Sequence, residues 1–327
     1  MKKKAILTTA ILCSLMANSS VYAQINERPV EGKQYNEYLY YDSDGNKSIS
    51  IQNIKIGEKN NYYFNEGATL DSSNGSVHAT ILTHNWGKNN SDTYNIFNIG
   101  KDKNFTIVKY GGEAALNVQE DANLEINGGN IILDTGLQNE EATDNTSAAI
   151  FVEDNSSANI KAQSLIIGNT HLEEGKHNAG AISAIVESEK ARNSMINIDL
   201  DNSFIADNVS FGIAIDSSVA NKVSTNITAG KDIKINAFIS NGEKVKGYNG
   251  AGIYALAYHD KNSLANTKLV SKNGDINISA QGYGYYGYGS TKAEFEAKNG
   301  NINLFSKESK GVYTNGTTNN NKLNFVC

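Results

Sequence analysis

The chain has 327 residues, a length that allows one large domain or two ordinary ones. Its 29 Lys and Arg against 35 Asp and Glu give a formal net charge of −6, with no cluster of basic residues. This charge pattern argues against nucleic acid as a partner, because neutralising phosphates requires grouped cations. Ile, Leu, Val and Phe recur at regular positions, which predicts a packed core. A single Pro suits continuous hydrogen-bonded ladders.

Residues 1–23 are typical of a secretory signal peptide. Three lysines precede an apolar run, and small residues occupy the positions that a signal peptidase requires, which predicts cleavage between Ala23 and Gln24. The alternative is an N-terminal membrane anchor. The apolar run, Ala5 to Met16, is shorter than the roughly 20 residues of a membrane-spanning helix, so cleavage and export are favoured.

An internal repeat follows from residue 94 onward. In each copy an alternating apolar and polar segment leads through Asn, Gly or Asp into a second such segment. The clearest copies are Tyr94–Ile99 with Asn104–Ile107, Ala122–Ile126 with Asn130–Leu133, Thr225–Ala229 with Asp232–Ala237, Thr267–Ser271 with Asp275–Ala280, and Ala293–Ala297 with Asn301–Leu304; weaker copies begin near Ala158 and Ser194. A third element, small and then aliphatic, occurs at Ala114–Leu116, Ala148–Ile150, Gly180–Ile182, Gly212–Ile215, Gly252–Ala255 and Gly311–Tyr313, and Gly282–Gly289 fills the remaining slot.

Short alternating elements of this kind cannot fold alone. Stacked about 4.8 Å from the equivalent element of the next copy, each would complete a parallel ladder and bury its inner aliphatic side chains. Small residues in the third element would leave room for side chains that point across the interior. The pattern therefore predicts an all-β fold, a right-handed parallel β-helix of about seven complete coils. An antiparallel sandwich is the alternative, but it does not explain three similar elements recurring in one order.

The domain organisation follows from where the repeat is visible. Residues 24–93 are rich in aromatic side chains and fit the repeat poorly, which predicts an N-terminal cap with irregular first coils. Residues 94–327 form the β-helix repeats. An eighth copy begins at Lys322 and stops inside its first strand, at Cys327, the one cysteine after the predicted cleavage site. We therefore expect the sequence to be an N-terminal fragment of a longer chain.

The signal peptide, the irregular cap and coils such as Asn273–Ile278 together resemble autotransporter passenger domains of the pertactin-like β-helix adhesin family. The resemblance covers the mature chain but is architectural. It implies type V secretion, in which the Sec translocon and an outer-membrane barrel export the passenger to the surface of a Gram-negative bacterium. Such a barrel would lie beyond this sequence or on a separate transporter. The resemblance also implies an adhesive role in virulence.

Catalytic and metal sites have only weak candidates. Asp199 and Asp201 lie on one predicted strand and face the same side, which is typical of outward-facing, solvated carboxylates. The segment Asp42–Asn46 resembles part of a calcium loop but lacks the downstream acidic ligand. The five histidines show no zinc-ligand spacing. We therefore expect no enzyme, and no catalytic, cofactor or metal residue is predicted.

The most distinctive local feature is a tyrosine-rich segment near the C-terminal end. Tyr283, Tyr285, Tyr286 and Tyr288 are separated by glycines and form a candidate binding surface for sugar rings or a protein partner. The alternative is a stack of aromatic rings, beside Tyr254 and Tyr313, that serves the solenoid itself. Three insertions that interrupt the short coils are further candidates for contact with a ligand: 136–147, 168–178 and 240–250.

The sequence thus predicts an exported protein with a structural or adhesive role. Its expected partners are a host-cell, matrix or glycan surface. Two alternatives remain open: a polysaccharide-active lyase or hydrolase on the same scaffold, and a passive surface stalk.

Overall fold

The computed structural model describes residues 40–41, 47–48, 51–52, 59–72, 79–85, 93–110, 114–137, 148–168, 177–186, 188, 191–217, 222–239, 248–257, 263–315 and 322–327. The predicted signal peptide with Ala23 and Gln24, the segment Asp42–Asn46 and most of the three insertions lie outside these residues. All regular secondary structure in the described ranges is β-strand.

Three parallel sheets make up the molecule, and each turn of chain contributes one strand to each sheet in the same order. The first sheet contains β4 (Lys59–Phe64), β7 (Thr93–Ile99), β10 (Ala122–Asn127), β13 (Ser157–Ala162), β17 (Asn193–Leu200), β20 (Lys222–Ala229), β23 (Leu264–Ser271), β26 (Thr291–Ala297) and β29 (Lys322–Val326). The second contains β5 (Ala68–Ser72), β8 (Asn104–Tyr110), β11 (Asn130–Leu137), β14 (Ser164–Gly168), β18 (Phe204–Val209), β21 (Ile233–Ala237), β24 (Ile276–Ala280) and β27 (Ile302–Ser306). The third contains β3 (Ile51–Gln52), β6 (Ala79–His84), β9 (Ala114–Gln119), β12 (Ala148–Glu153), β16 (Gly180–Val186), β19 (Ile213–Ser217), β22 (Ile253–Ala257), β25 (Tyr285–Gly289) and β28 (Val312–Asn315).

Two short antiparallel pairs stand outside this pattern. β1 (Tyr40–Tyr41) pairs with β2 (Lys47–Ser48), and β15 (His177–Asn178) pairs with the end of β11. Elsewhere the pairing is parallel and almost free of register shifts, so equivalent residues of successive coils lie side by side.

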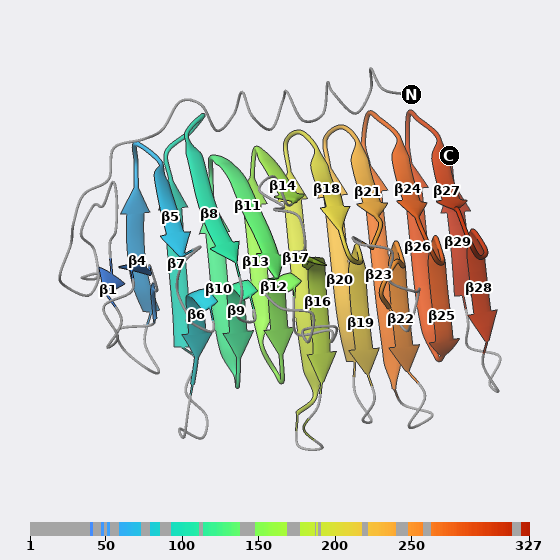
Figure 1. Ribbon diagram of the computed structural model, residues 1–327, viewed down its shortest axis with the longest axis horizontal. Coiled ribbons are helices and arrows are strands. Elements are labelled where there is room, and N and C mark those ends of the chain that lie inside the picture. The colour runs from blue at the N-terminus through green and yellow to red at the C-terminus, as the bar shows by residue number, and fades with distance from the viewer. Residues whose placement is uncertain are drawn as a thin grey trace.

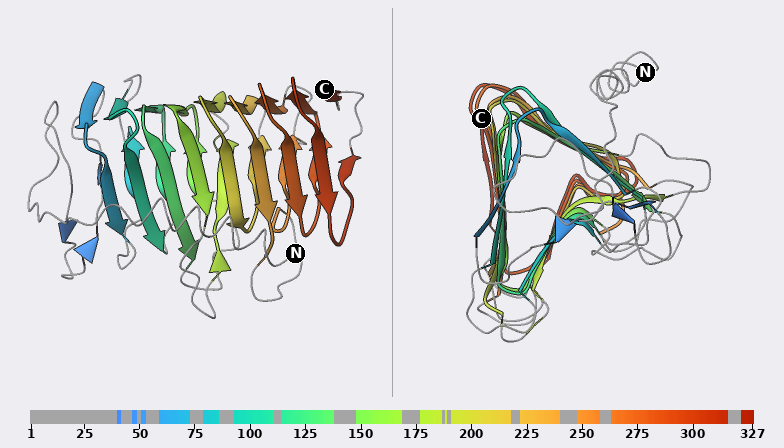
Figure 2. Two further views of the ribbon diagram at one scale, coloured as in Figure 1. Left: turned by 90° about the horizontal axis from the view of Figure 1, so that it is seen from above. Right: turned by 90° about the vertical axis from the view of Figure 1, so that its left-hand side faces the viewer.

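The arrangement confirms the predicted parallel β-helix. Strands of each sheet follow one another along the long axis in chain order (Figure 1). Seen along that axis, the three sheets form the walls of a narrow prism, and successive coils superpose (Figure 2). The three elements of each predicted copy supply the three sheets in turn. The right-handed sense and the number of coils stay predictions. β4, β5 and β6, within the range 59–84, already belong to the three sheets.

A continuous column of apolar side chains runs through the interior of the first sheet. Its members, one from each strand and paired in register, are Tyr62, Phe97, Ile126, Ile160, Ile198, Ile227, Leu269, Phe295 and Phe325. All are buried except Phe325, which is 45% exposed. The rings of Tyr62 and Phe97 stack with their centroids 4.7 Å apart, and those of Phe295 and Phe325 with theirs 5.4 Å apart. This column forms because strict alternation places every second side chain of each strand inside.

A second interior column contains polar residues that are fully buried. Near the N-terminal end the Asn60 amide donates to the Asn95 carbonyl oxygen at 3.1 Å, and the Asn95 amide donates to the Thr83 hydroxyl at 2.9 Å. Farther along, Thr225 and Thr267 are neighbours in the same column. Within the described part of the chain, their hydroxyls have no hydrogen-bond partner. The hydrogen-bonded asparagines satisfy their buried polar atoms, whereas the two threonines leave theirs unmatched.

The corner before the third sheet is built from glycine in the last four coils. Gly212, Gly252, Gly284 and Gly311 lie above one another, and a methyl group on Gly212 or Gly252 would collide with an isoleucine of the second sheet, Ile235 or Ile278. The predicted need for small residues in the third element is therefore confirmed, because they make room for side chains that point across the interior.

Candidate functional site

Tyrosines of the third sheet form an outward-facing column, here called the tyrosine ladder. Tyr254, Tyr286 and Tyr313 are register partners on β22, β25 and β28. Tyr254 and Tyr286 stack with centroids 4.6 Å apart and planes 7° apart, and Tyr286 and Tyr313 stack at 5.2 Å and 18°. Tyr283 packs obliquely beside the last two, and Tyr288 is 37% exposed.

The stacking limits what the ladder can bind. Inside the ladder each ring stacks on the next, and each of the two end rings has a further neighbour. Tyr248 meets Tyr254 edge-on at 6.0 Å, and the Lys310 ammonium lies 4.9 Å above the Tyr313 ring. Sugar rings stack on free aromatic faces, so the ladder offers a ligand mainly ring edges and hydroxyls. Its main effect is to hold adjacent coils together, at about 0.5–1.5 kcal/mol for each aromatic pair.

The ladder also changes the acidity of its central phenol. Burial raises the pKa of Tyr286, and the neighbouring phenols of Tyr313, Tyr283 and Tyr288 raise it further. A phenolate in this position would lose hydration and face other ionisable phenols, so the neutral form is favoured.

The four tyrosines predicted as one surface are divided between the two faces of β25. Tyr283, Tyr286 and Tyr288 lie outside, whereas Tyr285 is 1% exposed and meets the core residue Phe295 edge-on at 6.1 Å. Burial raises the pKa of Tyr285, and the neighbouring Thr291 hydroxyl opposes that rise. Tyr285 therefore belongs to the core and not to a binding surface. The register shows why: its partners in the adjacent coils are the apolar Ile253 and Val312.

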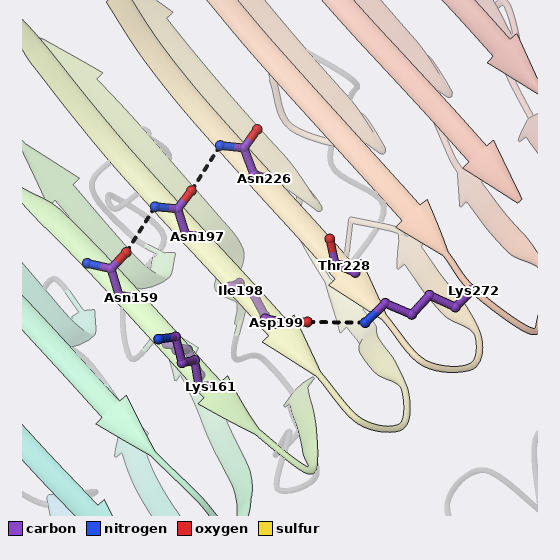
Figure 3. Close-up of a pocket in the computed structure, with 9 residues that line it drawn as sticks. Asn159, Lys161, Asn197, Ile198, Asp199, Asn226, Thr228 and Lys272 are labelled. Atoms are coloured by element: carbon purple, nitrogen blue, oxygen red, sulfur yellow. Dashed lines mark hydrogen bonds and ion pairs between the residues drawn. The ribbon is translucent and has the colours of Figure 1, made fainter. Parts of the chain in front are cut away.

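A second candidate site, which the sequence analysis did not identify, is a shallow hollow of about 270 Å³ on the outer face of the first sheet. We call it the amide groove. One wall is a row of asparagines from β13, β17 and β20 (Figure 3). The Asn197 amide donates to the Asn159 carbonyl oxygen, and the Asn226 amide donates to that of Asn197, each at 2.9 Å. The three side chains therefore all point their amide dipoles the same way along the solenoid.

The opposite wall of the groove carries charge. It consists of Lys161, Asp199 and Thr228, which are register partners on the same three strands. Lys272, from the turn after β23, extends toward Asp199, and their charged atoms are 3.6 Å apart (Figure 3). Both side chains of this ion pair are about half exposed, so the pair contributes little to stability. The Lys161 side chain is exposed, and its ammonium makes no hydrogen bond or ion pair with another described residue.

The floor of the groove is the sheet itself. Ile160 and Ile198 lie between the two walls in sequence, but their side chains point into the core and are at most 2% exposed. The backbone N–H and C=O groups here are used in the parallel ladders between the strands. The groove therefore offers side-chain amides, a hydroxyl, ammonium groups and the Asp199 carboxylate, and its floor has no free strand edge.

The two aspartates predicted to lie on one strand do not share it, because β17 ends at Leu200. Asp199 lies in the groove wall as described, and Asp201 is exposed in the turn that follows β17. Among the described residues, no group of three or more His, Cys, Asp or Glu side chains could hold a metal ion. No helix in the same residues is long and apolar enough to span a membrane.

Comparison with known proteins gives no match to a family model, a curated protein or a solved structure. The resemblance to autotransporter passengers stays a prediction.

Proposed function

We propose that the protein is a surface-exposed binding segment, of the kind carried by autotransporter passengers, that attaches to a host-cell, matrix or glycan surface. The observation that supports this proposal is the ordered outer surface of the solenoid. Aromatic, amide and charged side chains recur there in straight rows, one residue for each coil. Rows of this kind can contact a repeating or extended ligand at several points at once.

The physical argument rests on rigidity and spacing. Parallel stacking repeats every 4.8 Å or so, and side chains in the same row are held at that spacing by the ladder below them. A ligand with a similar repeat would make several weak contacts at once without further ordering of the protein. The free energy of these contacts can then exceed the entropy that is lost on association. A polymer on a cell or matrix surface satisfies this condition better than a small molecule does.

The binding half of the proposal is tested with the purified chain, labelled at the exposed Cys327 thiol and applied to cultured cells, matrix proteins and immobilised glycans. We expect saturable binding to at least one of these surfaces, competed by excess unlabelled chain. Chain unfolded by heat serves as the control, because it has the same composition but no ordered rows. Absence of competable binding on every surface, or depolymerisation of an offered polysaccharide, would overturn the proposal.

The export half is tested separately. When the chain is expressed with its own first 23 residues in a Gram-negative host, we propose that the Sec translocon moves it to the periplasm and that an outer-membrane barrel carries it to the surface. N-terminal sequencing of the recovered protein should begin at Gln24. A protein that keeps Met1 and stays in the cytoplasmic fraction would contradict this half without affecting the binding result.

A further inference from the structure

We infer that the amide groove binds a carboxylated sugar unit within a linear glycan. This inference rests on the proposed binding role, for which it names a site and a ligand class. The site lies on the first sheet, whereas the tyrosine ladder lies on the third.

The asparagine row supplies the first part of the argument. A side-chain amide has two N–H donors and two carbonyl lone pairs. In Asn197 the row uses one donor and one lone pair, so one of each is left for a ligand. A donor beside an acceptor on one rigid group matches two neighbouring hydroxyls of a sugar ring, each of which both donates and accepts. Because the row fixes the amide orientation, a ligand need not order it on binding.

Charge supplies the second part. Lys161, Lys272 and Asp199 give the groove a net charge of +1, on a chain whose formal net charge is −6. At its two ends the Lys268 ammonium is 2.6 Å from Glu294, and the Glu125 carboxylate, which keeps its negative charge, accepts from the Asn127 amide at 2.9 Å. The exposed Lys161 ammonium is therefore the group available to meet an anion. Its carboxylate partner would lie across the groove from the asparagines.

Size and surroundings select among anionic ligands. A volume of about 270 Å³ is below the roughly 300–1,000 Å³ of pockets for drug-sized molecules, so one sugar unit at a time fits. A peptide strand would need a free sheet edge or apolar pockets, and the floor of the groove offers neither. A nucleic acid would need several grouped cations. A glycan needs only hydroxyl contacts and one cation, and the groove crosses adjacent strands, so a linear chain could continue along the solenoid.

The test is a calorimetric titration of the full chain with a short oligogalacturonate. Its methyl ester, which has the same backbone without the charge, is the matched neutral probe. We expect the acid to bind about tenfold more tightly than the ester, because a hydrogen bond to a charged group outweighs one to a neutral group. Added salt should weaken the binding of the acid and leave the binding of the ester unchanged. Equal affinity for acid and ester would overturn the inference, and so would tighter binding of a sulfated galactan oligomer.

Substitutions locate the site. Lys161→Gln should remove most of the preference for the acid, and Asn197→Ala should weaken both probes about fivefold. Asp199→Asn should raise the affinity for the acid severalfold, because it removes a negative charge that repels the ligand carboxylate and frees the Lys272 ammonium from its ion pair. Asn303→Ala is the matched control, since its amide makes an equivalent bond to Asn277 at 2.8 Å on the second sheet. It should leave both affinities unchanged.

The outcomes separate this inference from the proposed function. If Lys161→Gln and Asn197→Ala bind the acid as well as the Asn303→Ala control does, the groove is not the site, even where the chain still binds cells. If the chain binds oligogalacturonate through the groove but binds no cell, matrix or glycan surface, the inferred site stands and the proposed adhesive role fails. Unchanged circular dichroism and urea midpoints show that each variant is folded.

Discussion

The glycine column gives a quantitative test of how tightly the coils pack. A methyl group on Gly252 would lie 2.7 Å from the carbonyl oxygen of Gly284 in the next coil, and it would also collide with Ile278. That carbonyl cannot move away freely, because it accepts a backbone hydrogen bond from Ile253 at 3.0 Å. Gly311 is the same residue type in the same column, but a methyl group there would meet only the carbonyl oxygen of Leu304, at 3.2 Å.

These contacts set the expected magnitudes. Overpacking a tight interior costs about 1–3 kcal/mol, and Gly→Ala returns about 0.4–1 kcal/mol by restricting the unfolded chain. Gly252→Ala should therefore destabilise the protein by about 1–2 kcal/mol. Gly311→Ala should change stability by less than about 0.5 kcal/mol, because the mild contact and the entropy gain offset each other.

The assay is urea unfolding of the two variants and the parent, followed by circular dichroism and tyrosine fluorescence. A lower midpoint for Gly252→Ala at unchanged slope, with Gly311→Ala close to the parent, is the expected result. Equal midpoints for the two variants would refute the argument, and so would a larger loss for Gly311→Ala.

Further predictions follow from individual side chains. Thr225→Val should raise stability by about 1 kcal/mol in urea unfolding, because it removes a buried hydroxyl that lacks a partner among the described residues; a loss would show that the hydroxyl is satisfied. Glu294→Gln should cost about 0.2–1 kcal/mol at neutral pH. The hydrogen bond with Lys268 lowers the pKa of Glu294, so the cost of the substitution should vanish as acid protonates the carboxylate of the parent. A cost that does not change with pH would contradict the ion pair. Because burial raises the pKa of Tyr286, the folded state should lose stability as alkali ionises the phenols of the unfolded chain. Tyr286→Phe should reduce this loss in thermal melts at high pH. An equal loss in the parent and the variant would contradict the raised pKa.

The sequence was sufficient to predict the fold because one rule places most of the core. Strict alternation, restarted by Asn and Gly at each corner, puts residues such as Ile126, Ile160 and Ile198 inside at the same position of every coil. The eight strand starts inferred from the repeat lie in or beside the strands of the first sheet for the same reason. No long-range information beyond the repeat itself was needed.

The surfaces were harder to predict. Aligning Tyr285 with Ile253 and Val312 would have placed it inside, so the sequence did contain the information that divides the four tyrosines. The sequence indicated the amide groove less clearly, by an asparagine that recurs at the same position in three copies of the repeat. Lys272 could not be assigned to the groove from the repeat, because it lies in a turn and its side chain extends past β20 to reach Asp199 on β17. The direction of a side chain in a turn cannot be predicted from the alternation of apolar and polar residues in the strands.

The ladders, the groove and the glycine column all depend on coils that stack in parallel and in register. Paired cysteines test this most directly, in a chain that starts at Gln24 and carries Cys327→Ser, which removes both native cysteines. The probe is a short thiol cross-linker that becomes fluorescent only when it bridges two thiols. Cysteines at Asn277 and Asn303, register partners in adjacent coils, would lie about 4.8 Å apart and should be bridged rapidly. Cysteines at Lys234 and Asn303, two coils apart in the same row, would be separated by twice that spacing and should not be. Equal bridging of the two pairs, or bridging of the distant pair alone, would contradict the stacked solenoid.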